Sequence, residues 1–238
     1  WGRKRTATDS VVFTAVAGQG GILMLQLLFG TADSDREERL FSLLKQREGL
    51  RRCLLIVPEQ FSLTAERHLL ERFGDGLPLW LEVLSFRRLP DYVFRRLGGR
   101  NRRLLTDGGA RILLSGAVEA TRPHLRHYQN AALKPDFIEQ LKRQFDEFSA
   151  QCVDPDDLRR LCGDLPDAEL GDKLCDLSLL YAAYLARIGE GALCAQFALD
   201  AAVELLWEHN IFDRTDVFIT HFKGFTPQEL SAVERMLA

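Results

Sequence analysis

Apolar residues gather into short runs in the first part of the chain and into longer helical stripes further along it. Four runs have the length and flanking turn residues of buried strands: residues 25–29, 53–57, 81–85 and, near the end, 216–220. Amphipathic helical patterns at 37–47 and 64–73 alternate with the first three runs. This alternation predicts an α/β fold with a parallel sheet, because parallel strands need a crossover between them.

A long helical stretch separates the third run from the fourth. Residues 170–188 carry one continuous apolar stripe, and residues 136–149 place several aromatic side chains on one face. Core packing explains these aromatic residues more simply than ligand stacking does. The sequence therefore predicts an all-helical insertion at 106–210 within an α/β core formed by residues 24–105 and 211–238.

The overall composition is that of an ordinary globular protein, but charge is unevenly distributed along the chain. Of the 238 residues, 46% are hydrophobic and 27% are charged, and the formal net charge is −3. Between residues 87 and 111, eight arginines and two acids give a local balance of +6, whereas ten acids and three bases between 146 and 176 give −7. Arginine forks suit phosphate oxygens, so the first stretch favours contact with a nucleic-acid backbone; a solvated helix face is the alternative.

The residue content argues against a membrane protein, a secreted protein and a metalloprotein. No apolar run reaches the roughly 20 residues that span a bilayer, and the apolar stretch within residues 1–21 is too short and broken for a secretory signal. We therefore expect a cytoplasmic protein with no membrane partner. The five cysteines are widely spaced and include no Cys-x-x-Cys pair, which predicts free thiols, no disulfide framework and no metal site.

The residues after the first strand-like run lie where a nucleotide-binding P-loop would be expected. Gly30 takes the first position of the pattern G-x-x-x-x-G-K-[ST]. Asp35, Arg36 and Glu37 replace the second glycine, the lysine and the hydroxyl, which adds bulk or negative charge where phosphates and magnesium would lie. The acids would instead favour the positive end of the following helix. The nucleotide-binding candidates of this degenerate loop are Gly30, Ser34, Arg36 and Glu37, and we identify no catalytic residue.

Two places at the ends of strand-like runs are candidates for contact with DNA. The start of the helix after residues 53–57 offers uncharged donors close to free helix N–H groups. The residues at the end of run 81–85 lie where open α/β sheets place ligands. The nucleic-acid-binding candidates are Gln60, Ser62, Thr64, Ser85, Arg87 and Arg88. The alternative is that Glu59 and Gln60 only cap a helix and that Arg87 pairs with an acid.

Four segments resemble motifs of the AddB/RexB family, in the family's order. Residues 54–60, with Glu66 after them, resemble a VPEQ…E motif, and residues 83–89 resemble V-x-S-F-x-R-L. Residues 170–177, followed by two tyrosines, are similar to a K-L-x-D-L…Y…Y helix, and residues 222–230 are similar to F-x-x-F-T-P-Q-E. Each segment is weak by itself, but four of them in order make the resemblance specific.

The resemblance implies a subunit of a two-chain helicase–exonuclease that processes double-strand breaks for recombination. Its partners would be DNA and an AddA-type helicase–nuclease subunit. Its sheet would be P-loop-NTPase-like and flanked by helices, so that the chain would form the first helicase-like α/β domain with its helical insertion. ATP and magnesium would belong to the family's intact motif, and an iron–sulfur cluster to its C-terminal region, so we expect no cofactor in this chain.

The chain departs from the family pattern in both halves of the ATP site. The family's G-x-x-G-S-G-K-[ST] loop is replaced by residues 30–37, and its I-D-G-F segment reads I-T-H-F at 219–222. The lysine, the hydroxyl and the magnesium-binding acid are therefore all missing, which predicts an inactive ATP site. Residues 1–23 match nothing in the family, whose start would fall at Met24, so we expect them to be an extended or non-native start.

The sequence leaves three functions open. The first, which we favour, is a non-catalytic helicase-like module that contacts DNA within a repair complex. The second is an active ATP-driven motor, in which Arg36 and Glu37 would replace their usual counterparts. The third is a helical platform whose only partner is the sister subunit. Nucleotide binding separates the second function from the others, and salt-dependent DNA binding separates the first from the third.

Overall fold

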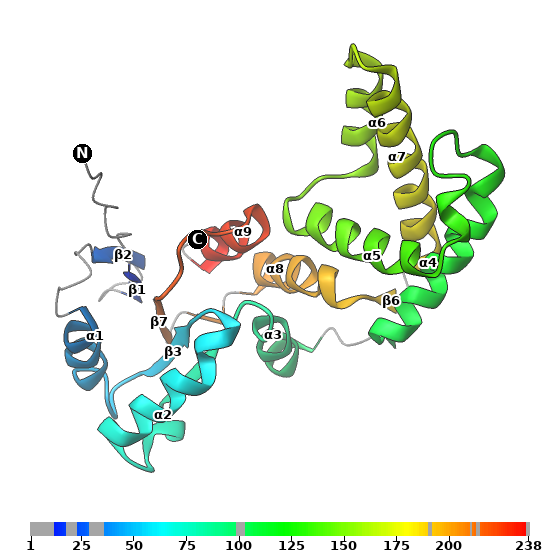
Figure 1. Cartoon of the computed structure of the whole chain (residues 1–238). Helices are drawn as coiled ribbons and strands as arrows, with labels where there is room; N and C mark the ends of the chain where they lie inside the picture. The colour runs from blue at the N-terminus through cyan, green and yellow to red at the C-terminus, as the bar shows by residue number, and fades with distance from the viewer. Residues whose placement is uncertain are drawn as a thin grey trace, which may run out of the picture. The chain divides into compact units, whose positions relative to one another are not determined.

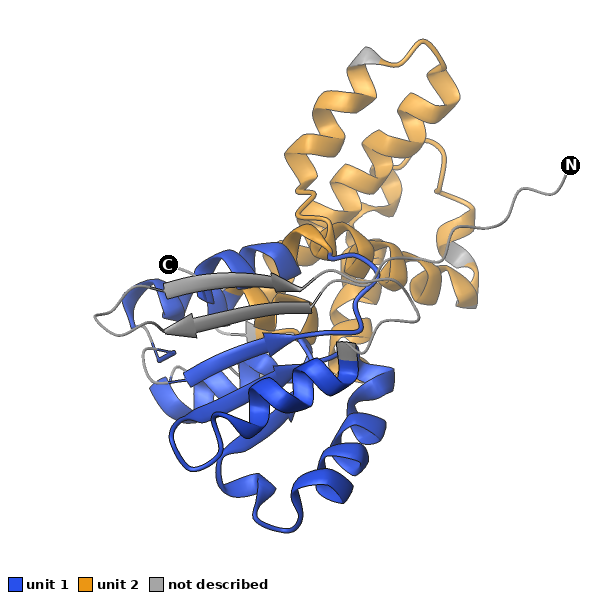
Figure 2. Ribbon diagram, turned by 90° about the vertical axis from the view of Figure 1, so that its left-hand side faces the viewer, with its two compact units in different colours: residues 1–98, 201–225, 229–238 blue, residues 99–200, 226–228 orange. Residues whose placement is uncertain are grey.

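The chain divides into two compact units (Figure 2). The computed structural model describes residues 12–17, 23–28, 36–98, 103–189, 192–209, 211–212 and 215–236. Unit 1 comprises residues 1–98, 201–225 and 229–238, and unit 2 comprises residues 99–200 and 226–228. Within the described ranges, no helix is both long and apolar enough to cross a membrane. The expected division into an α/β core at 24–105 with 211–238 and a helical insertion at 106–210 stays a prediction.

Unit 1 is built on a five-stranded sheet with the strand order β2-β1-β7-β3-β4. The strands β1, β2, β3 and β7 are labelled in Figure 1. Three neighbouring strands are parallel: β3 (Arg52–Ile56), β4 (Leu81–Leu84) and β7 (Thr215–Ile219). They confirm three of the predicted strands and the α/β class. β3 lies between the other two, and its side chains from Cys53 to Ile56 are all buried. This burial on both faces explains its uninterrupted apolar run, since such a strand needs no polar side.

The rest of the sheet shows that the prediction of a parallel sheet holds only in part, because the full sheet is mixed. β2 (Leu23–Leu28) lies in the sheet, as its apolar run predicted, but it pairs antiparallel with β1 (Val12–Ala17). β1 in turn pairs antiparallel with β7, with Ala15 opposite Val217. β2 therefore runs in the same direction as the parallel strands but is separated from them by β1. The pattern of apolar runs did not predict β1. The P-loop-NTPase-like fold and the extended or non-native start at 1–23 stay predictions.

Two helices share one hydrophobic core with the sheet: α1 (Arg36–Lys45) and α2 (Ser62–Phe73). Leu44 of α1 and Leu69 of α2 are buried there together with Phe218 of β7. Both helices form where the amphipathic patterns predict them. α2 ends at Gly74, which adopts a φ of 76°, a left-handed conformation that glycine takes without strain.

Three further helices contribute to unit 1. They are α3 (Leu89–Leu97), α8 (Ala198–Glu208), of which the residues from 201 on belong to this unit, and α9 (Pro227–Met236). Tyr92 of α3 stacks on Phe212, with ring centroids 6.5 Å apart. Arg235 of α9 donates from Nε to the Leu206 carbonyl of α8 at 2.7 Å. The first contact joins α3 to the segment before β7, and the second joins α9 to α8.

Unit 2 is mainly helical. Its four long helices are α4 (Asp107–Thr121), α5 (Pro135–Ala150), α6 (Pro155–Asp164) and α7 (Ala168–Ile188). Phe145 of α5 lies in the centre of the core, with its ring centroid 4.6 Å from that of Tyr181 and 5.9 Å from that of Tyr184 on α7. The apolar stripe of residues 170–188 is therefore a packing face, and core packing of these aromatic residues is confirmed.

A small strand pair shows that the predicted insertion is not entirely helical. β5 (Arg103–Leu104) and β6 (Ala192–Leu193) pair in parallel, and the Leu105 N–H extends the pair by donating to the Leu193 carbonyl at 2.9 Å. β5 precedes α4 and β6 follows α7, so the pair joins the two ends of the helical segment. Two-residue strands are too short to produce a recognisable period. Short 3-10 helices connect the larger elements: η1 (Glu59–Phe61), η2 (Leu77–Leu79), η3 (Arg122–His124), η4 (Ala131–Leu133) and η5 (Ala195–Phe197).

Candidate nucleic-acid interface

The two predicted DNA-contact segments follow neighbouring strands at the same edge of the sheet. β3 and β4 pair in parallel with Ile56 opposite Leu84, and the Val57 N–H continues the pairing by donating to the Leu84 carbonyl at 2.9 Å. η1 and α2 follow β3, and residues 85–88 follow β4. Because the carboxyl ends of parallel strands meet at one edge, the structure brings the two segments together.

A partly buried hydrogen bond joins these segments. Ser85 is 2% exposed, and its hydroxyl donates to a carboxylate oxygen of Glu59. The same hydroxyl oxygen accepts the backbone N–H of Arg88 at 3.3 Å. Ser85 therefore ties η1 to the residues before α3, and a DNA contact through its hydroxyl would have to break these bonds. The sequence alone did not assign Glu59 this role.

Gln60, Ser62 and Thr64 lie around the start of α2. Gln60 and Thr64 are exposed, and the Ser62 hydroxyl donates to the Glu59 carbonyl at 2.9 Å. No side chain caps α2 at Phe61, but η1 runs directly into α2, so the N–H of Ser62 already donates to the Glu59 carbonyl. The helical segment therefore begins at η1, where Pro58 supplies no side-chain cap either. Glu59 binds Ser85 and does not act as the cap. The N–H groups at such a helix start carry partial positive charge, which suits a phosphate.

Arg87 and Arg88 are both exposed but have different surroundings. Arg88 Nη1 lies 3.6 Å from an oxygen of Glu66, the acid of the VPEQ…E resemblance. The two side chains are 50% and 41% exposed, so this ion pair is weak. Among the described residues, no carboxylate lies within ion-pair distance of Arg87. The ion pair with an acid that was the alternative role for Arg87 is thus formed by Arg88.

Aromatic packing connects this edge with another family-like segment. Phe86 is buried, and its ring centroid lies 5.3 Å from that of Phe222 and 6.0 Å from that of Phe225. Phe222 and Phe225 stack on each other at 5.0 Å. These rings belong to the V-x-S-F-x-R-L and F-x-x-F-T-P-Q-E segments, so two distant motifs form one aromatic cluster in unit 1.

Most of the predicted nucleotide loop lies outside the described residues. This applies to Gly30 and Ser34, and Arg36 is described only as the first residue of α1. Glu37 is exposed, with a carboxylate oxygen 3.5 Å from Nδ1 of His68, and Glu38 binds Arg72 at 2.7 Å. The first-turn acids of α1 therefore contact side chains of α2.

A pocket of about 210 Å³ opens between α1, α2 and the ends of β3 and β7. Its described lining is mainly apolar and contains neither lysine nor arginine. The polar residues in the lining are Glu37, Thr64, His68, Thr220 and His221. A polyphosphate would need cationic or N–H ligands, so this lining suits an uncharged molecule better.

In the turn after β7, a histidine adopts a backbone conformation that usually favours glycine. His221 adopts a φ of 67°, and the resemblance places the glycine of I-D-G-F at this position. Its imidazole lies against Phe61, with ring centroids 5.4 Å apart. Thr220, which the resemblance to I-D-G-F places at the position of the acid, is buried, and its N–H donates to the Ile56 carbonyl at 3.1 Å. A hydroxyl there supplies no negative charge for magnesium.

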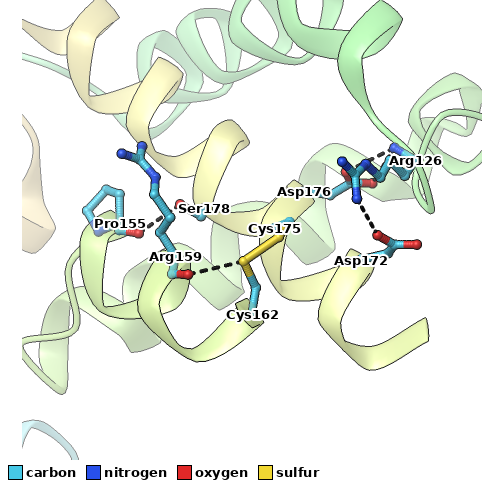
Figure 3. Close-up of a disulfide and its surroundings, with 8 residues drawn as sticks. All are labelled: Arg126, Pro155, Arg159, Cys162, Asp172, Cys175, Asp176 and Ser178. Carbon is cyan, nitrogen blue, oxygen red and sulfur yellow. Dashed lines mark hydrogen bonds and ion pairs between the residues drawn. A yellow bond between two sulfur atoms is a disulfide. The ribbon is translucent and has the colours of Figure 1, made fainter. Parts of the chain in front are cut away.

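The acid of the K-L-x-D-L resemblance in unit 2 has a structural partner (Figure 3). Asp176 is 2% exposed, and its carboxylate accepts the backbone N–H groups of Arg126, His127 and Tyr128 at 2.8–3.1 Å. The side chain of Arg126 binds Asp172 at 2.9 Å. Asp176 therefore holds the loop after η3 against α7, a role that the sequence pattern did not show.

The prediction that all five cysteines are free thiols is wrong for two of them. Cys162 of α6 and Cys175 of α7 form a disulfide, with Cα atoms 5.5 Å apart (Figure 3). Cys53 and Cys194 are buried and free, and Cys152 is exposed and free. The pairing was hidden because it depends on how the α6–α7 hairpin packs. In the described part of the chain, no group of three or more potential metal ligands is assembled.

Comparison with known proteins assigns the chain to a family. The family profile described as "ADDB, N-terminal" matches residues 27–238. The chain belongs to this family. A Clostridium kluyveri protein, named as the B-type subunit of an ATP-dependent helicase/deoxyribonuclease, is 29% identical over 218 residues, which cover 90% of this chain. Proteins of the same name from two Clostridium botulinum strains are 28% identical over 218 residues and cover the same share.

The resemblance to AddB that the four motifs indicated is confirmed. The chain spans 19% of the length of these relatives. It corresponds to the N-terminal part of an AddB-type helicase/deoxyribonuclease subunit.

Proposed function

We propose that this chain is a helicase-like module that contacts DNA within a helicase–deoxyribonuclease and does not itself hydrolyse ATP. The observation that supports the DNA contact is the sheet edge joined by the Glu59–Ser85 hydrogen bond. This bond holds η1, which has no side-chain cap at its start and leads directly into α2, close to Arg87 and Arg88. Helix N–H groups and arginines both bind phosphate oxygens, so the edge suits the backbone of a nucleic acid.

The contact surface that we propose uses Gln60, Ser62 and Thr64 from α2 and η1, with Arg87 and Arg88 from the residues after β4. Ser85 is buried beneath this surface and supports it without contacting DNA, because its hydroxyl donates to Glu59. Arg87 is the charged residue of this surface with the fewest interactions that would compete with a phosphate. Arg88 would exchange its weak pairing with Glu66 for a phosphate.

Fluorescence anisotropy with a labelled single-stranded oligonucleotide, measured over a range of salt concentrations, tests this proposal. Each arginine–phosphate contact on single-stranded DNA contributes about 0.7 to the slope of log K against log salt. The variant R87A/R88A should therefore bind more weakly and lose roughly 1.4 from this slope. An unchanged affinity and slope would remove the two arginines from the interface.

The matched control is R72A/R95A, which also removes two exposed arginines from unit 1. Arg72 and Arg95 lie in the last turns of α2 and α3, whereas the proposed surface lies at the first turn of α2 and before α3. Their ion pairs with Glu38 and Glu82 are exposed. This variant loses the same charge, so an equal loss of affinity would indicate a non-specific charge effect.

The absence of ATP hydrolysis is supported by the acids near the predicted loop. Glu37 contacts His68 at the pocket, and Thr220 replaces the family's acid after β7. Calorimetric titration of magnesium–ATP into the chain should show no binding in the micromolar range. The active-motor alternative requires micromolar affinity for magnesium–ATP, and the variant Arg36→Ala should then abolish this binding.

An AddA-type helicase–nuclease subunit is the protein partner that we propose, on the basis of the family. The platform alternative shares this partner but lacks the DNA contact. Co-purification with an AddA-type subunit, combined with the absence of salt-dependent DNA binding by this chain, would favour the platform. Binding of DNA that weakens steeply with salt would favour the DNA-contact module.

A further inference from the structure

Two cysteines face each other across the α6–α7 hairpin of unit 2 (Figure 3). Cys162 and Cys175 are 13 positions apart in the sequence, and their Cα separation of 5.5 Å lies in the usual range for disulfides. The two helices approach closely at Gly171, where an added Cβ would lie 3.0 Å from the Cys162 carbonyl oxygen. The packing of the hairpin therefore sets the distance between the two sulfur atoms.

The surroundings of this pair suit the reduced state as well as the disulfide. Sγ of Cys162 lies 3.1 Å from the Arg159 carbonyl oxygen (Figure 3). A thiol can donate to this oxygen, whereas a disulfide sulfur has no hydrogen to donate. Both cysteines are half-buried, so a small reagent can reach them. Cys53 and Cys194, in contrast, are buried.

The disulfide lies at the turn end of the hairpin, where large apolar side chains are exposed. Leu161 and Leu170, which flank the turn between the helices, are 52% and 42% exposed. At the opposite end of α6, the Ser178 hydroxyl donates to the Pro155 carbonyl at 2.7 Å, and a capping box holds the first turn. Opening of the disulfide would therefore loosen the turn end of the hairpin first.

We propose that Cys162 and Cys175 form a reversible redox-modification site, which a small disulfide of the glutathione class closes and the corresponding thiol opens. One cysteine attacks the oxidised reagent, forms a mixed disulfide and releases one thiol. The other cysteine then attacks the mixed disulfide and releases the second thiol. The pair loses two electrons and two protons, and the reagent gains both as two thiols. The closed site orders the α6–α7 hairpin, independently of the proposed DNA contact.

Peptide mapping after redox equilibration tests the chemistry. The full chain is incubated with mixtures of reduced and oxidised glutathione, free thiols are blocked with N-ethylmaleimide, and the unreduced digest is analysed by mass spectrometry. We expect a Cys162–Cys175 cross-link that increases with the oxidised share and disappears when reduced glutathione is added. C152S removes an exposed thiol outside the pair and should leave this response unchanged. Cysteines that stay open to N-ethylmaleimide at the oxidised end, or that end as stable glutathione adducts, would overturn the proposal.

Hydrogen exchange on the same samples tests the structural consequence. Amides around residues 158–175 should exchange at least about tenfold more slowly in the oxidised chain, because closure of so short a loop restricts the opened state. Amides of α4 and α5 should change little. C162S should show the fast exchange under both conditions. Equal exchange in the oxidised and reduced wild-type chain would show that the pair does not order the hairpin.

Discussion

The family-like motifs have different roles in the two units. In unit 1, the segments that resemble VPEQ…E and V-x-S-F-x-R-L follow two strands and leave Gln60 and Arg87 exposed at one sheet edge. In unit 2, the K-L-x-D-L…Y…Y segment lies along α7 and buries Asp176, Tyr181 and Tyr184. A shared motif can therefore mark either a surface for a ligand or a framework contact, and burial together with hydrogen-bond partners separates the two roles.

The physical basis of this difference is the position of each motif in its element. A chain that leaves a parallel strand emerges at the edge of the sheet, where polar side chains can meet a ligand. A motif in the middle of a long helix places residues at three- and four-residue spacing on one packing face. Even in unit 1 the two roles are mixed, because Ser85 and Phe86 are buried between exposed neighbours.

The sharpest test of the framework role is Asp176→Ala. We expect the free energy of unfolding to fall by about 3 kcal/mol, because the backbone N–H groups of the loop at Arg126 would lose a charged acceptor. Urea denaturation followed by circular dichroism measures this loss. Asp172→Ala, on the same helix with an exposed partner, should change stability by less than about 1 kcal/mol. A loss below about 1 kcal/mol for Asp176→Ala would place this acid among the residues to be tested for ligand contact.

Ser85→Ala tests the link between framework and surface in unit 1. The variant removes the donor to Glu59 and the acceptor for the Arg88 N–H, which should lower stability by about 1–2 kcal/mol. If the bond positions the DNA-contact residues, affinity for single-stranded DNA should also fall by roughly tenfold, which corresponds to about 1.4 kcal/mol. Ser42→Ala, at an exposed position of α1, is the matched control. Reduced stability with unchanged DNA affinity would make Ser85 a framework residue like Asp176.

A further comparison concerns the two cores at alkaline pH. Burial raises the pKa of Cys53 in unit 1 and of Tyr181 in unit 2, each to about 12. The folded protein keeps both groups neutral, whereas the unfolded chain ionises them near their ordinary pKa values of about 8.5 and 10. Their contribution to stability is therefore complete below these ordinary values and is lost as pH rises towards about 12.

Urea denaturation between pH 8 and pH 11 can separate these two contributions. The variant C53A should lose less stability than the wild type from about pH 9 upwards, and Y181F only from about pH 10. The thiol ionises first in the unfolded chain, so its effect begins at the lower pH. The same pH dependence in both variants and the wild type would show that neither group is linked to unfolding.

The sequence by itself determined the local elements and the family. The strands around Leu55, Val83 and Phe218, the helices α1 and α2, and the apolar stripe of α7 all follow from the spacing of apolar residues. Such spacing reflects which faces of an element must be buried. This information lies within at most about twenty neighbouring residues, so it can be recognised without the tertiary structure. The AddB family was recognisable because short motifs keep their order along the chain.

Only the tertiary structure decided which of these residues meet. It inserted β1 between β2 and β7, buried Ser85 against Glu59, paired Arg88 with Glu66 and joined Cys162 to Cys175. Each of these contacts joins segments that are far apart in the sequence or lie in different elements. The periodicity of one element cannot predict them, since strand order and helix packing arise from contacts between elements. The candidate DNA edge was therefore located from the sequence, but the division of its residues between surface and framework required the fold.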